Sequence, residues 1–151
     1  MKRVNIKNTR SKKYAAVLRK IERDKVCPFC TKYFLKYHTR PIIKNGRHWI
    51  LTENFNPYPG TTHHLLVVSK KHVTHFKDLP PAAHAEIFAI LAPELKKRGI
   101  KGGGIFMRFG DTDYNFSSVG HLHAQLIVGV KRGKHTELLL APLGYKTKKK
   151  K

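Results

Sequence analysis

The chain has 151 residues, 40% of them hydrophobic, and is therefore long enough to form one domain around a buried core. Its eight Phe, six Tyr and one Trp exclude a globally disordered chain, and no apolar run approaches the roughly 20 residues that span a bilayer. The formal net charge of +22 points towards anionic partners but identifies no ligand on its own.

The positive charge is concentrated at the two ends. Residues 1–25 contain ten Lys and Arg against two acidic residues, and residues 131–151 contain eight against one. Residues 146–151 are typical of a solvated tail. Basic ends raise the local concentration of nucleotides or nucleic acid, although a general lysine bias of the proteome would give the same composition. The N-terminus lacks the apolar core of a secretory signal, so we expect a soluble cytoplasmic protein with no membrane contact.

Hydrophobic spacing predicts a mixture of helices and short strands. Apolar residues recur with helical spacing over 11–24, where Ser11 can cap the first turn. A second helix opens at Pro80-Pro81 and ends at Gly99 after a basic run, with Pro93 placed to kink it near its end. Strands are predicted over residues 48–52, 64–68, 103–109 and 121–128, with a turn-rich loop at 54–60.

These elements favour an α+β fold, with an antiparallel sheet and flanking helices, over a doubly wound parallel sheet. Helices and strands do not alternate regularly along the chain, as a parallel sheet would require. We divide the sequence into a basic N-terminal helix (1–24), a central domain (25–130) and a basic C-terminal extension (131–151).

The strand near residue 121 carries the residues suited to chemistry. Because side chains alternate between the faces of a strand, His121, His123 and Gln125 point to one face. The other face is apolar, with Leu122, Ala124 and Leu126. Two imidazoles and an amide in register on one face are difficult to explain by packing alone.

The order His-apolar-His-apolar-Gln-apolar-apolar resembles the signature of the histidine triad (HIT) superfamily. Gln in third place is typical of the branch with galactose-1-phosphate uridylyltransferase and dinucleoside polyphosphate phosphorylase. The segment from Asn54 through Gly60 to His72 also resembles the family's turn and following strand. Ser118 lies where the family has a small hydroxyl residue before the triad. The resemblance covers roughly residues 25–130 and implies a HIT-like catalytic domain there.

The resemblance implies a role for each site residue. His123 would attack the α-phosphorus of a nucleotide and form a nucleotidyl-histidine intermediate, which suits a neutral imidazole near pH 7. Gln125 can donate a hydrogen bond to a phosphoryl oxygen but cannot titrate, which favours transfer or phosphorolysis over hydrolysis. Ser118 would contact the phosphate, and Ser117 and Asn54 would bind the nucleotide. Asn54 would equally suit an ordinary turn. The family also implies a homodimer.

The two cysteines are spaced as Cys27-Pro-Phe-Cys30, which in a cytosolic protein suggests metal or redox chemistry rather than a structural disulfide. In several HIT proteins two such cysteines share a structural zinc with two histidines. The resemblance implies a closed four-ligand site of Cys27, Cys30, His72 and His121; two free thiols are the alternative. We interpret the other histidines as structural or exposed: His38, His48, His63, His64, His75, His84 and His135.

The leading hypothesis is thus an enzyme that cleaves a nucleotide phosphoanhydride or phosphoramidate and passes the nucleotidyl group to phosphate, a sugar phosphate or water. The chain has the length of compact HIT hydrolases but the Gln of the longer transferases, so a compact hydrolase is one alternative. A nucleic-acid-associated protein on the same scaffold is another. A third is an enzyme that removes adenylate from nucleic-acid ends, which would combine the two.

Overall fold

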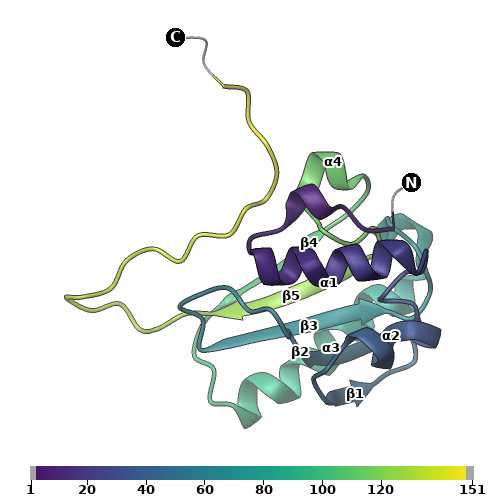
Figure 1. The fold of residues 1–151 in the computed structure, drawn as a ribbon. Coiled ribbons are helices and arrows are strands. Elements are labelled where there is room, and N and C mark those ends of the chain that lie inside the picture. Colours follow the sequence, from purple (N-terminus) through teal and green to yellow (C-terminus); the bar gives the residue numbers. More distant parts are fainter. Residues whose placement is uncertain (1–2, 149–151) are drawn as a thin grey trace.

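The computed structural model, which describes residues 3–148, is an α+β fold built on one five-stranded antiparallel sheet (Figure 1). The strands lie in the order β1-β2-β3-β5-β4. Their bounds are β1 (Ile42–Asn45), β2 (Trp49–Glu53), β3 (His63–Ser69), β4 (Gly104–Arg108) and β5 (His123–Val128). The helices are η1 (Ile6–Asn8), α1 (Lys12–Arg23), α2 (Thr31–Tyr37), η2 (Phe76–Asp78), α3 (Pro81–Lys97) and α4 (Thr112–Asn115). The predicted fold class is confirmed.

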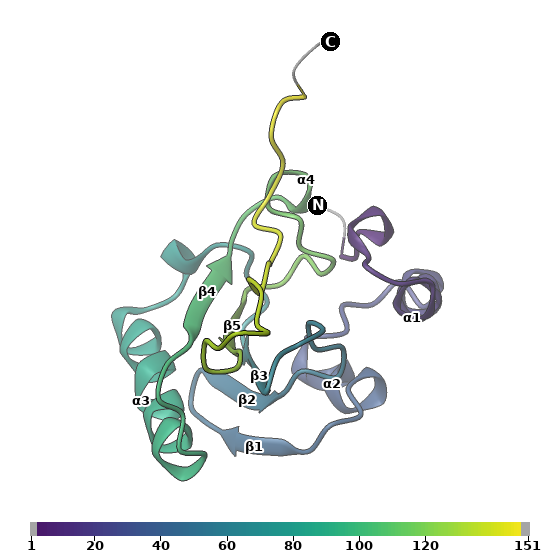
Figure 2. The same ribbon diagram turned by 90° about the vertical axis from the view of Figure 1, so that its left-hand side faces the viewer.

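The sheet separates two layers of helices, with α3 on one side and α1 and α2 on the other (Figure 2). The face towards α3 carries the larger core, in which Leu122, Ala124 and Leu126 meet Ile87 and Leu91 of the helix. The opposite face is covered by a second cluster that includes Phe29, Phe34 and the β3 residues Leu66 and Val68. A shift of one residue would turn each side chain towards the other layer of helices and disrupt both clusters, so packing on the two faces together fixes the strand register.

Most of the predicted elements are present close to their expected bounds. Helix α1 begins after Ser11, whose hydroxyl oxygen accepts from the backbone N–H of Tyr14, and α3 begins at Pro81 and is followed by Gly99 with φ of 61°. Helix α3 continues through Pro93 to Lys97. The sequence did not predict β1, α2 or α4, which have four, seven and four residues and are too short for an apolar period to stand out.

One boundary was wrong in a way that affects the site. Strand β5 begins at His123, and His121 lies in the bend before it. The backbone of this bend is held by other loops, since Leu122 N–H donates to the Val73 carbonyl and the Leu122 carbonyl accepts from Ser69 N–H. Strand alternation therefore applies to His123 and Gln125, whereas another set of contacts orients His121.

Both ends of the chain pack against the loop that precedes β5. Val4 forms an isolated antiparallel bridge with Val119, and Asn8 donates from its amide to the carbonyls of Thr112 and Ser117. After β5 the chain has no helix or strand up to residue 148; it runs out from the body and returns past α4 (Figure 1). There the ring of Tyr145 meets Phe116. Part of the predicted solvated tail, residues 149–151, lies outside the described residues.

Within residues 3–148, no helix combines the length and the apolar character needed to cross a membrane.

His38, at the C-terminal end of α2, joins this helix to the sheet. Its ring is buried, stacks on Phe34 with centroids 4.7 Å apart, and donates from Nε2 to Thr52 Oγ1 at 2.7 Å. Thr52 Oγ1 in turn donates to the Pro41 carbonyl, so it accepts from the histidine. Burial, assisted by the nearby Arg40, lowers the pKa of His38 from 6.5 to about 4. The folded protein therefore favours the neutral ring.

We predict that His38 makes the fold sensitive to acid. A histidine whose pKa is lower in the folded state stabilises the fold above pH 6.5, and this stability is lost as the pH falls towards 4. Between pH 7 and pH 5, the free energy of unfolding measured with denaturant should fall by about 1 kcal/mol less in His38→Gln than in the wild type. The exposed His84→Gln should behave like the wild type. Equal pH dependence in all three proteins would contradict the assignment.

Candidate active site and metal centre

A pocket opens on the sheet face opposite α3, between α1, the loop after β2 and the loop before β5. The structure brings five of the predicted site residues into its lining: Asn54, Ser117, Ser118, His123 and Gln125. The remaining lining residues are Asn8, Arg10, Tyr14, Phe29, Phe55, Asn56, Tyr58, Leu66, Arg108, Phe116 and Val119. The other four predicted residues form a separate cluster beside the pocket, described below.

The backbone of the neighbouring bend holds His123 in one tautomer. Its Nδ1–H donates to the carbonyl of His121 at 2.7 Å, which leaves Nε2 with a free lone pair. The ring is buried and packs edge-on against Phe29, with centroids 5.1 Å apart. Burial is the main reason that the pKa of His123 falls to about 4. The residue is therefore a neutral imidazole near pH 7, with its unprotonated nitrogen available as a nucleophile.

Gln125 is oriented by a histidine that the sequence analysis did not assign to the site. Tyr58 N–H donates to His64 Nδ1 at 3.0 Å, so the proton of this neutral ring is on Nε2. His64 Nε2–H then donates to Gln125 Oε1 at 2.7 Å. Among residues 3–148, no group is hydrogen-bonded to the Gln125 amide nitrogen, which is thus free to donate to a ligand.

His64 is buried, and burial lowers its pKa to about 4, so the ring acts in this chain as a fixed neutral donor. The sequence predicted both the strand that carries His64 and the strand that carries Gln125. It did not predict that these strands are neighbours in the sheet, with His64 opposite Ile127 and Leu66 opposite Gln125.

The serines lie at the other wall of the pocket. Ser118 Oγ is 2.9 Å from the hydroxyl of Tyr14, which comes from α1. Ser117 is buried, and its hydroxyl donates to the Val119 carbonyl at 2.9 Å. Phe116, just before them, has a left-handed backbone with φ of 58°, which is uncommon for a bulky side chain and recurs at functional sites as well as in turns.

Asn54 makes the turn that the alternative interpretation expected, and it also lines the pocket. Its Oδ1 accepts from Asn56 N–H at 2.9 Å, which is a local side-chain turn. Its amide nitrogen is in contact with Nε2 of His64 at 3.0 Å, but both atoms are donors, because the Nε2 proton is given to Gln125. The two interpretations of Asn54 are therefore compatible.

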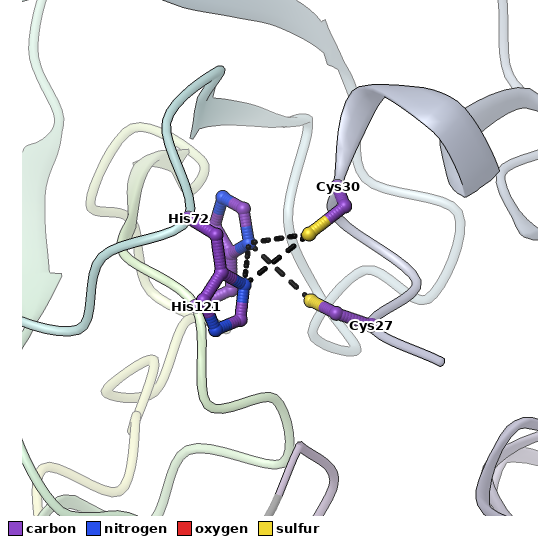
Figure 3. A group of neighbouring side chains, drawn as sticks. All are labelled: Cys27, Cys30, His72 and His121. Carbon is purple, nitrogen blue, oxygen red and sulfur yellow. Dashed lines mark hydrogen bonds between the residues drawn. The ribbon is translucent and has the colours of Figure 1, made fainter. Parts of the chain in front are cut away.

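Cys27, Cys30, His72 and His121 come together from three distant parts of the chain. Their ligand atoms all lie within 4.8 Å of one another, and Figure 3 shows both imidazoles facing the two sulfur atoms. The Sγ to Nδ1 distances are 3.3 Å for Cys27 and His121, and 3.2 Å for Cys30 and His72. The two Nδ1 atoms are 3.1 Å apart. No disulfide joins the two cysteines.

These distances suit one tetrahedral ion. Zinc bound at about 2.3 Å from sulfur and about 2.0 Å from nitrogen places neighbouring ligands roughly 3.3–3.8 Å apart. His121 Nε2–H donates to the Ser69 carbonyl at 2.7 Å, which leaves Nδ1 unprotonated on the side of the cysteines. Burial raises the pKa of Cys27 to about 11, a penalty that a cation at the centre would offset. The cluster is compatible with a structural zinc.

Comparisons with known proteins identify the fold. No protein-family model and no curated protein matches this chain. Among solved structures, a HIT family hydrolase from Clostridium thermocellum is 21% identical, with a TM-score of 0.51 over 72% of this chain and 93% of that one. The histidine triad nucleotide-binding protein from Candida albicans is 14% identical, with a TM-score of 0.53 over 70% and 82%.

A Zn-bound histidine triad family protein from Mycobacterium smegmatis is 21% identical, with a TM-score of 0.50 over 75% of this chain and 83% of that one. Likeness at this level of identity concerns the backbone arrangement. The chain has the fold of the histidine triad proteins.

We predict that the purified protein carries one zinc ion per chain. Replacing one of four ligands in Cys30→Ser should lower zinc affinity by more than about 100-fold, because an open or weaker site replaces a closed one. Metal content by mass spectrometry and zinc competition with a chelator would measure this. His84→Ala, which removes an exposed histidine outside the cluster, is the control. Folded wild-type protein that neither contains nor takes up zinc would refute the prediction.

Proposed function

We propose that this chain is an enzyme of the HIT superfamily that acts on the α-phosphate of a nucleotide polyphosphate, phosphoramidate or nucleotide sugar through a nucleotidyl-histidine intermediate. The observation that carries the proposal is the hydrogen bond from His123 Nδ1 to the His121 carbonyl. It leaves Nε2 unprotonated in a residue that lines a pocket with Ser118 and Gln125.

The first step would form a P–N bond and break a P–O or P–N bond. The lone pair of His123 Nε2 attacks the α-phosphorus, and the leaving group departs with the electron pair of the bond it loses. A phosphate departs as an anion, whereas an amine also takes up a proton from the solvent. In the second step, an oxygen of phosphate, a sugar phosphate or water attacks the same phosphorus and releases His123 with its lone pair restored. Two displacements of this kind replace one difficult transfer.

Gln125 supports transfer or phosphorolysis over hydrolysis. Its amide nitrogen can donate to a phosphoryl oxygen and stabilise charge there, but it cannot supply or remove a proton. A phosphate leaves as an anion and needs no proton, whereas water must lose one in order to attack. The same residue supports kinship with the uridylyltransferase and phosphorylase branch.

The remaining assignments are proposals of the same kind. Ser118, held beside Tyr14, would donate to the phosphate, while Asn54 and Ser117 would contact the nucleotide. Zinc would have a structural role, because four protein ligands leave no open position for substrate. Two proteins of similar fold, a HIT family hydrolase and a histidine triad nucleotide-binding protein, support this choice of chemistry.

We also expect a cytoplasmic homodimer in which two sheets meet. Strand β4 lies at an edge of the sheet, where its outer backbone groups are available to pair, and Ile105 on it is exposed.

We predict that His123 becomes covalently labelled. Incubation with radiolabelled dinucleoside tetraphosphate, with and without phosphate, should attach acid-labile nucleotide to the wild type, because phosphorus–nitrogen bonds hydrolyse in acid. His123→Ala should attach none and should lose roughly three orders of magnitude or more of turnover.

His84→Ala, which changes an exposed histidine outside the pocket, should label like the wild type. If no nucleotide substrate labels the wild type, and short nucleic acid binds equally to it and to His123→Ala, the scaffold hypothesis replaces the enzyme hypothesis.

The basic ends support a contact with nucleic acid, either as a scaffold or in removing adenylate from nucleic-acid ends. We predict that deleting residues 146–151, which removes five lysines, weakens nucleic-acid binding and leaves mononucleotide chemistry unchanged. Each lysine that contacts a duplex phosphate contributes about 0.9 to the slope of log affinity against log salt, so the slope should become shallower. Titrations at several salt concentrations would measure it, and an unchanged slope would count against the contact.

A further inference from the structure

Two arginines reach the pocket from distant parts of the sequence. Arg10 lies in the turn between η1 and α1, and Arg108 is the last residue of β4. Both line the same pocket as His123. Arg108 is directly paired with His123 across the β4–β5 register, which places it on the strand beside the nucleophile.

A single tyrosine holds both guanidinium groups. Arg10 lies over the ring of Tyr58, 3.8 Å from its centroid, and also donates to the Asn56 carbonyl at 2.9 Å. Arg108 donates to the hydroxyl of Tyr58 at 2.8 Å and to the Pro142 carbonyl. Tyr58 is itself buried and stacks on His64 with centroids 5.0 Å apart. The two cations are therefore held by the same framework that orients Gln125.

Within the part of the chain that the structure describes, no acidic group forms an ion pair with these two arginines. None of the ion pairs within residues 3–148 involves Arg10 or Arg108. The pocket lining contains no Asp or Glu. Arg108 also has a buried Nε for which the described residues provide no hydrogen-bond partner. Arg10 is exposed and Arg108 is half-buried, so both guanidinium groups are accessible from the pocket. An anion bound there would pair with both positive charges, and the unused buried Nε of Arg108 is a donor that the described residues leave unsatisfied in the free protein.

The charge exceeds what a single α-phosphate requires. An α-phosphate in a diester-like linkage carries one negative charge, and Gln125 and Ser118 already offer neutral donors to it. Two arginines carry ten N–H donors, in a planar geometry suited to phosphate oxygens, and within residues 3–148 only three of these donors are used, by Asn56, Tyr58 and Pro142. A second phosphate joined to the first would match this arrangement.

We propose that Arg10 and Arg108 form a subsite for the phosphate of the leaving group, so that the substrates are nucleotidyl phosphoanhydrides, in which the α-phosphate is linked to at least one further phosphate. This inference rests on the proposed function and narrows it. Phosphoramidates with an uncharged amine as leaving group are poor substrates. When the P–O bond breaks, its electron pair goes to the departing phosphate, and the two arginines stabilise the additional charge. No proton is needed, in agreement with the amide at position 125.

The test compares two substrates that share a nucleoside and differ in the leaving group. One is a dinucleoside tetraphosphate and the other is the 5′-phosphoramidate of the same nucleoside. In Arg10→Met and Arg108→Met, kcat/KM for the tetraphosphate should fall roughly 10- to 100-fold, while kcat/KM for the phosphoramidate should stay within about threefold of the wild type. Arg47→Met removes an exposed arginine from the β1–β2 turn, outside the pocket, and should change neither value. Equal losses on both substrates, or no loss on the tetraphosphate, would overturn the proposal.

A binding measurement tests the subsite without catalysis. Inorganic tripolyphosphate, titrated calorimetrically, should bind the wild type and Arg47→Met equally and bind Arg10→Met and Arg108→Met at least about tenfold more weakly. Equal binding to all four proteins would refute the subsite. If the difference in binding holds while no nucleotide substrate labels His123, the subsite stands and the proposed enzyme function fails. Arg108→Lys keeps the positive charge and is the control for Arg108→Met. It separates a loss of binding caused by the missing charge from a loss caused by misfolding.

The second phosphate of the substrate can belong to either of two kinds of molecule, a free nucleotide or the 5′ end of a nucleic acid. A 5′-adenylated oligonucleotide contains the same phosphoanhydride as a dinucleoside polyphosphate. If its kcat/KM is the higher of the two and also falls in Arg108→Met, the subsite accepts a nucleic-acid end. If only the dinucleoside polyphosphate is cleaved, the subsite accepts a free phosphate chain.

Discussion

The hydrogen bond from His123 Nδ1 to the carbonyl of His121 connects the two halves of this site. The backbone of His121 determines which nitrogen of His123 carries the proton, and the ring of His121 belongs to the cluster with the two cysteines. Any ion held there would fix the bend whose carbonyl orients His123. Because His121 precedes β5 rather than lying in it, the bend can direct its ring to the cysteines while its carbonyl meets the next histidine.

The pocket keeps its histidines neutral and obtains its positive charge from arginine. Burial is the main cause, and nearby Arg10 or Arg108 a smaller one, of the fall in the pKa of both His64 and His123 to about 4. A neutral ring can donate or accept a hydrogen bond at a defined nitrogen, as His64 does to Gln125. Arginine remains charged under the same conditions. Anion attraction and nucleophilic character are thus carried by different side chains.

The two chain ends contribute to the site as well as to the net charge. Residues before α1 bridge to the loop that carries Ser117 and Ser118, and Arg10 enters the pocket from this region. The C-terminal segment returns to the same wall, where the Pro142 carbonyl accepts from Arg108 and the Tyr145 hydroxyl donates to Asn8. The basic ends of the chain therefore also make specific contacts, through residues that lie between the lysines.

The sequence by itself determined the features that have a local period. Alternation along one strand placed His123 and Gln125 on a common face over an apolar stripe, and helical spacing located α1 and α3. The Cys-x-x-Cys spacing indicated a metal or redox site, and resemblance to the HIT superfamily completed it with His72 and His121. Tertiary structure alone decided which carbonyl orients His123, that His64 fixes Gln125, and that Arg10 and Arg108 share Tyr58. Each of these contacts depends on how separate strands, loops and chain ends approach one another, and no spacing within a single segment encodes that approach.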